Sequence, residues 1–125
     1  ASPIKLANFI GDANVVDAEI INKKSNLYDL KIAEMNIKIE SDNNLSKIVS
    51  VALRPEKILI DRNIKENSIH ATINTASFVG SNYQYILNSN VGKLYVVSGD
   101  TRDIFKVGEK VFLSIKDQDV KILND

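Results

Sequence analysis

From Val15 onward, apolar and polar residues alternate in short runs, and this period of two constrains the fold more than any other feature. A half-buried β-strand points successive side chains to opposite faces, whereas a helix repeats about every 3.6 residues. Turn-forming residues separate the runs. The pattern predicts an all-β fold of about nine or ten short strands. A small closed barrel, or a pair of them, suits such strands because closure leaves no strand edge exposed.

Individual runs give more specific predictions. The alternation from Ile69 to Thr75 predicts a long strand that ends near Gly80. Leu94–Val97 is apolar on both faces, which favours a central position in a sheet. Ahead of the strands, Ser2, Pro3 and a stop at Gly11 predict one short N-terminal helix. No internal repeat is evident along the chain.

The stretch Val51–Ile60 reads as a strand that is broken once, at Pro55. Proline fixes its own φ, has no N–H and holds the preceding Arg54 extended. We therefore expect a strand to end at Arg54, with one β unit before the break near residue 55 and a second unit after it. Arg54 and Glu56 flank the proline, and an arginine fixed in this way can form a two-pronged pair with a carboxylate. The alternative is a kinked strand with two solvated charges.

Composition excludes several classes of function. The 125 residues include 16 Lys or Arg and 16 Asp or Glu, so the basic excess typical of duplex nucleic-acid binders is missing. The chain has no cysteine, which excludes disulfides and thiolate chemistry. No apolar run approaches the roughly 18 residues of a membrane-spanning helix. The first residues do not have the pattern of a secretory signal.

Residues capable of catalysis or metal binding are sparse. His70 is the only histidine, and alternation places it on the polar face of its strand. The loop pairs Asp100 with Asp103 and Asp117 with Asp119 match no calcium-loop spacing and are expected to be solvated turn residues. Phosphate-binding glycine loops are missing from the sequence. We therefore predict no catalytic residue and no metal site in this chain.

Four passages in order resemble the ATP-binding subunits of bacterial ABC importers. Ala7–Asn14 resembles the "F-I-G-x-x-N" passage that follows the ATPase domain, and Val51–Glu56 resembles the "R-P-E" passage of the transport-associated OB (TOBE) domain. Phe78–Tyr83 and the segment from Gly108 to Val120 resemble two later passages of that domain. The resemblance covers nearly the whole chain and is greatest to spermidine/putrescine importers, with ferric-iron and maltose importers close.

The resemblance implies an OB-like (MOP-like) fold with a regulatory and dimerising role. Residues 1–14 would be the end of the ATPase-domain helix and a linker, and residues 15–125 the regulatory domain. ATP and Mg would bind the upstream ATPase domain, so no cofactor is expected here. The implied partners are a second copy of the subunit, in a homodimer, and the permease subunits, with no nucleic acid and no direct membrane insertion. The implied location is the cytoplasmic face of the membrane.

The resemblance also suggests where contacts form. Arg54, Pro55 and Glu56 are the predicted structural or dimer contact. Tyr83 and Tyr85 are the predicted surface for a small ligand or partner, although tyrosines on such strands also pack in cores.

Other readings of the sequence stay open. A free-standing double OB module that binds a small ligand or oxyanion is the main alternative. A single-strand nucleic-acid binder would need basic residues beside its aromatic rings. An enzyme is disfavoured because no acid, base and nucleophile set can be assembled.

Overall fold

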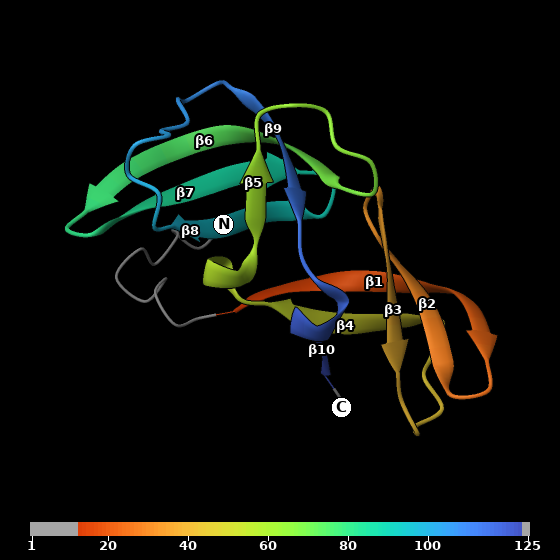
Figure 1. The fold of residues 1–125 in the computed structure, drawn as a ribbon. Helices are drawn as coiled ribbons and strands as arrows, with labels where there is room; N and C mark the ends of the chain where they lie inside the picture. The colour runs from red at the N-terminus through yellow and green to blue at the C-terminus, as the bar shows by residue number, and fades with distance from the viewer. Residues whose placement is uncertain (1–12, 124–125) are drawn as a thin grey trace.

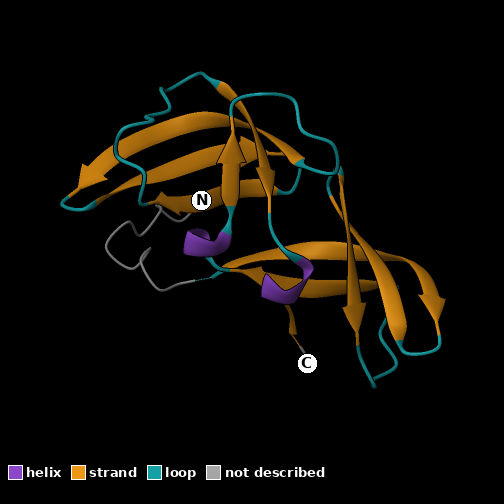
Figure 2. Cartoon of the chain, in the orientation of Figure 1, coloured by secondary structure: helices purple, strands orange, loops and turns teal. Residues whose placement is uncertain are grey.

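A computed structural model describes residues 13–123 of the chain (Figure 1). Within that range the chain forms ten strands and two short 3₁₀ turns, η2 (Pro55–Lys57) and η3 (Asp117–Asp119), which confirms the all-β prediction. Figure 2 shows that strands and loops make up nearly all of the described structure. The predicted N-terminal helix lies outside the described residues.

The first sheet is antiparallel, with the strand order β10-β4-β1-β2-β3. Inward-facing residues alternate with outward-facing polar ones, as a sheet with one buried face requires. The register of β1 against β2 shifts between Ile20 and Asn22, which marks a bulge. The strands are β1 (Asn14–Lys24), β2 (Leu27–Ile32), β3 (Met35–Glu40), β4 (Ile48–Leu53) and β10 (Val120–Leu123).

The second sheet is also antiparallel and has the order β5-β9-β6-β7-β8. Its longest strand is the one that the alternation from Ile69 predicted, and it carries a register shift between Ile73 and Thr75. The strands are β5 (Leu59–Asp61), β6 (Ile69–Val79), β7 (Asn82–Ser89), β8 (Gly92–Ser98) and β9 (Lys110–Ser114).

The two sheets repeat one topology, although no repeat is evident in the sequence. Replacing β1, β2, β3, β4 and β10 by β6, β7, β8, β9 and β5 converts one strand order into the other. The longest strand of each sheet carries the register shift, and a 3₁₀ turn precedes each exchanged strand, β5 and β10. The repeat is therefore one of topology, and it is not visible as a repeat in the sequence. Few positions are shared, and most of these are apolar, for example Leu53 with Ile115 and Ile58 with Val120.

Each half of the chain completes its sheet with a strand from the other half. β5 follows β4 in the sequence but pairs with β9, and β10 follows β9 but pairs with β4 (Figure 1). Buried residues from both sheets form one hydrophobic cluster, including Leu30 and Val51 from the first sheet and Leu87 and Leu113 from the second. The predicted boundary near residue 55 falls at η2, where the chain leaves the first sheet for the second.

The strand over Leu94–Val97 is at the edge of its sheet, so the prediction of a central position was wrong. β8 pairs with β7 along one side only. Leu94 and Val96 face the core, whereas Tyr95 and Val97 are half-buried on the other face. The apolar second face is explained by neighbouring segments that cover the strand, among them Asn14 at the start of β1.

Candidate functional site

Two asparagine side chains join the sheets at equivalent positions. Asn14 donates to the carbonyls of Leu53 (3.0 Å) and Tyr95 (2.9 Å) and accepts the N–H of Tyr95 (2.7 Å). Asn67, just before β6, donates to the carbonyl of Asn36 (2.9 Å) and accepts its N–H (2.6 Å). Each amide thus takes the place of a neighbouring strand at the edge of the opposite sheet.

The Arg54-Pro55-Glu56 passage lies where β4 ends. Pro55 is buried and starts η2, Arg54 is extended at φ −72° and ψ 133°, and Glu56 is exposed. This confirms that the strand ends before the proline, because proline has no N–H to donate to a neighbouring strand. The turn brings Arg54 and Glu56 to different hollows, because Arg54 lines one beside β10 and Glu56 lines one beside β8.

The hollow beside β10 carries an excess of positive charge. Its volume is about 400 Å³, and its charged lining residues are Arg54, Lys57, Lys121 and Asp119. Three cations against one carboxylate make this hollow attractive to an anion. The sequence singled out Arg54 here but not the two lysines, because Lys121 reaches the site only through the exchanged strand β10.

The two predicted tyrosines have different surroundings. Tyr83 is half-buried and stacks on Tyr85, with ring centroids 5.9 Å apart, and its ring also contacts that of the exposed Phe78. Tyr85 is fully buried, and its hydroxyl accepts the N–H of Phe105 at 3.1 Å. The structure therefore places Tyr85 in the core rather than on the surface, because it faces the same side of the sheet as Val96. Burial raises the pKa of Tyr85 above its usual value of 10.

Arg62 holds the long loop between β8 and β9 and was missed by the sequence reasoning. Its guanidinium lies 4.4 Å from the ring centre of Phe105, pairs with Asp103 at 2.9 Å and also pairs with Glu109. Backbone N–H donation from Lys106, together with Arg62, lowers the pKa of Glu109 below its usual value. No short motif marks these residues, because they are far apart in the chain.

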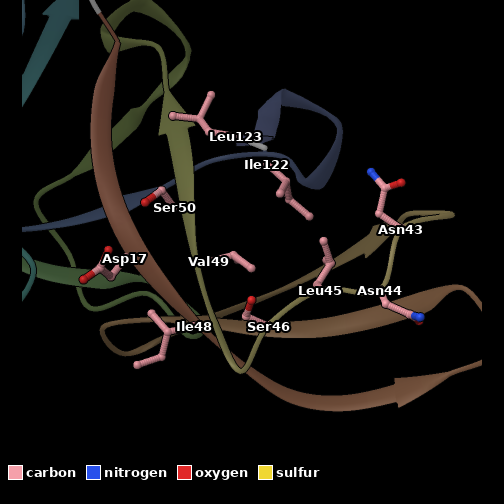
Figure 3. Close-up of a pocket in the computed structure, with 10 residues that line it drawn as sticks. All are labelled: Asp17, Asn43, Asn44, Leu45, Ser46, Ile48, Val49, Ser50, Ile122 and Leu123. Carbon is pink, nitrogen blue, oxygen red and sulfur yellow. The ribbon is translucent and has the colours of Figure 1, made fainter. Parts of the chain in front are cut away.

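A cleft of about 450 Å³ runs along β4 beyond the end of β10, as Figure 3 shows. Leu45, Val49 and Ile122 form its apolar part, and Asp17, Asn43 and Ser50 supply polar groups. The cleft is wide because β10 pairs only with residues 50–53 of β4, which leaves Ile48 and Val49 without a strand on that side.

The polar residues noted in the sequence are exposed, except for Asp119, which is half-buried. His70 is exposed on the outer face of β6, and the Asp100 carboxylate accepts the N–H groups of Arg102 and Asp103, as expected of a turn residue. Between residues 13 and 123, no group of three or more His, Asp or Glu side chains is arranged to hold a metal ion. In the same range, no helix is long and apolar enough to cross a membrane.

Comparison with solved structures supports the fold. The cytoplasmic molybdate-binding protein ModG, solved with molybdate bound, superposes with a TM-score of 0.71 at 13% identity. The alignment covers 90% of this chain and 96% of that one. At 13% identity, the similarity establishes the OB-like fold alone.

Comparison with characterised sequences points to transport proteins. The Fe(3+) ions import ATP-binding protein FbpC of Fusobacterium nucleatum is 29% identical over 125 residues, covering 96% of this chain and 32% of that protein. FbpC of Brucella suis is 21% identical over 119 residues, covering 95% of this chain and 33% of the relative. The chain therefore spans about a third of the length of the curated relatives it matches.

The family assignment follows from a profile match over the larger part of the chain. The profile described as "TOBE domain" matches residues 51–123, which include η2, all of the second sheet and the charged residues of the hollow beside β10, called the basic hollow below. Since that match exceeds half of the sequence, the chain belongs to the TOBE domain family, and it resembles the TOBE domain of ABC importer ATP-binding proteins.

Proposed function

We propose that this chain is the regulatory domain of the ATP-binding subunit of an ABC importer and helps two copies of that subunit to associate. The observation that carries the proposal is the alignment of 96% of the chain with an importer ATP-binding protein that is about three times longer. In this proposal ATP and Mg bind a separate ATPase domain, and this domain performs no catalysis. The assembly would lie at the cytoplasmic face of the membrane, with the permease subunits as partners.

Ferric iron is the better supported transported substrate. The relatives described above are named for Fe(3+) import. This favours iron over the spermidine or putrescine that the sequence resemblance suggested. Polyamine transport is therefore kept as the competing outcome of the uptake assay.

The experiment removes residues 15–125 in frame from the gene and measures uptake of radiolabelled ferric iron and of spermidine by whole cells. Loss of iron uptake, restored by the intact gene, supports the proposal. Loss of spermidine uptake alone would reassign the substrate. Unchanged uptake of both, with the truncated protein present at normal abundance, would contradict an importer role.

The predicted contact at Arg54 is tested separately by sedimentation and thermal melting of Arg54→Ala. Glu19→Ala, an exposed change on the outer face of β1, is the matched control. Weaker self-association at an unchanged melting temperature would support a contact between copies. A variant that matches the control in both measurements would rule that contact out.

Oxyanion binding is a second candidate function, favoured by the basic hollow and by the ModG fold. Arg54, Lys57 and Lys121 would supply charge-assisted bonds to the anion. Titration calorimetry with molybdate, and with sulfate and phosphate as competitors, tests this candidate. Binding that is lost in Lys57→Met and retained in Lys31→Met supports it, and the absence of heat with all three anions contradicts it.

A further inference from the structure

A further polar cavity lies on the outer face of the second sheet, away from the hollow beside β10. Its volume is about 440 Å³, and its walls come from β6, β7, β9 and the tip of the β2–β3 hairpin. Such a volume accommodates a small molecule. The side chains used in the argument below are those of Glu34, His70, Thr72, Asn88, Lys110 and Phe112.

Glu34 provides a fixed negative charge at one end. One carboxylate oxygen accepts the backbone N–H of His70 at 3.1 Å, and the other accepts the side-chain amide of Asn90 at 2.6 Å. Burial raises the pKa of Glu34, but the bond from His70 and its neighbours outweigh burial and hold the pKa below its usual value. A carboxylate has about four lone-pair positions, so Glu34 retains capacity to accept a ligand ammonium.

Lys110 provides a positive charge further along the sheet. It is exposed, and it pairs with Thr72 across β9 and β6, while Thr72 pairs on its other side with Asn88 of β7. Glu34 lies beside the row of His70 and Phe112, because it accepts the N–H of His70, and Lys110 lies in the next row on the same face. Two residues along a strand separate these rows, which corresponds to about 7 Å.

An aromatic pair also lines the cavity. The rings of His70 and Phe112 meet edge to face, with centroids 5.1 Å apart. Aromatic faces attract ammonium groups and pack against methylene chains. The cavity therefore offers an anion beside an aromatic pair, and a cation in the next row along the strands.

We propose that this cavity binds a small linear zwitterion, with its ammonium group at Glu34 and its carboxylate at Lys110. A ligand with a single charge would leave one end of the cavity uncompensated, and complementary charges at both ends favour the dipolar molecule. Thr72 and Asn88 would donate to the carboxylate. The separation of the rows favours ω-amino acids over α-amino acids, whose two charges are closer together.

His70 offers a direct readout because it is the only histidine in the chain. Its imidazole protons should give a single set of NMR signals in the 125-residue chain, and the ring lines the cavity. The experiment titrates glycine, 4-aminobutanoate and 6-aminohexanoate at constant pH and follows those signals. Hexanoate and hexylamine, which each lack one charge, are the matched analogues.

The proposal expects saturable shifts of His70 with at least one ω-amino acid and much weaker shifts with both single-charge analogues. Glu34→Gln and Lys110→Met should each weaken binding by about ten-fold, the loss of one charge-assisted contact. Lys93→Met is the control, because Lys93 pairs with Asn88 on the same face but does not line the cavity.

Three results would overturn the proposal. The first is the absence of any saturable shift in the unmodified protein, which requires no variant to fold. The second is equal binding of hexanoate or hexylamine, which would indicate an anion or amine site instead. The third is equal loss of binding in Lys93→Met and Lys110→Met, which would indicate a general effect of surface charge.

Discussion

The side-chain amide of Asn14 forms hydrogen bonds with both the N–H and the carbonyl of Tyr95, which lies on the edge strand of the other sheet. The same amide also donates to Leu53 at the end of β4. One buried side chain, only 4% exposed, therefore ties together the beginning of β1, the end of β4 and the edge of β8.

Replacing Asn14 by alanine should destabilise the domain by about 2–4 kcal/mol, because buried backbone groups lose their partners. Asn67→Ala removes the equivalent pair of hydrogen bonds to Asn36, which is exposed, and should lower the free energy of unfolding by about 1 kcal/mol. Urea denaturation followed by circular dichroism measures both values. Asn63→Ala, an exposed change in the loop before β6, is the control. An equal loss of unfolding free energy in Asn14→Ala and Asn63→Ala would show that the hydrogen bonds of Asn14 do not stabilise the domain.

Gly108→Ala should destabilise the domain by about 1–2 kcal/mol, because Gly108 has φ +90° and left-handed backbone disfavours a Cβ. No heavy atom lies within 4 Å of the added Cβ, so the cost would come from the backbone alone. Gly99→Ala is a matched control, with equally open space and no positive φ. Thermal melts of the two variants should differ, and identical midpoints would refute the backbone explanation.

Acid should weaken the attachment of the β8–β9 loop through Glu109. In the folded state, the N–H of Lys106 and the guanidinium of Arg62 lower the pKa of this carboxyl. The ionised carboxylate therefore adds to the stability of the folded state at pH values above the unfolded pKa. That contribution to stability is lost as the pH falls below the ordinary glutamate pKa of 4.5 and through the lower pKa of the folded state. Glu109→Gln should flatten the acid limb of the stability curve. An unchanged slope would show that Glu109 is not responsible.

Tyr85 should ionise above its usual pKa of 10, because burial raises the pKa of its hydroxyl. Since the folded pKa is raised, the associated stability is present below the unfolded pKa and is lost as the pH rises through the folded value. Spectrophotometric titration should show a tyrosine ionisation above pH 10 that the variant Tyr85→Phe lacks. The same variant should be less stable by about 1–3 kcal/mol, because the buried N–H of Phe105 loses its acceptor. Tyr83→Phe serves as the control, and loss of the same step there would reverse the assignment.

Much of the fold was accessible from the sequence because its determinants are local. Alternation from Ile69 predicts β6, and the missing N–H of Pro55 predicts the end of β4. The edge position of β8 was not accessible, because its second face is covered by residues distant in the sequence, such as Asn14. The exchange of β5 and β10 likewise depends on which sheet each strand joins, and period-two patterning is the same in both cases.

The candidate sites were less accessible for the same reason. Arg54 was identified beside its proline, but Lys121 joins it only through the pairing of β10 with β4. Glu34 and Lys110 belong to different halves of the chain and share a cavity only after both sheets form. Tyr83 and Tyr85 look alike in sequence, and burial against Phe105 distinguishes them.

The exchanged strands also bear on synthesis by the ribosome. β10 is the last described strand to be made, and it pairs along β4 in the sheet formed by the first residues of the domain. The first sheet is therefore incomplete, with one edge of β4 unpaired, until β10 has left the exit tunnel. Such late, long-range closure slows folding and exposes an edge to neighbouring nascent chains. A pause in translation shortly before β10 would lengthen that exposure.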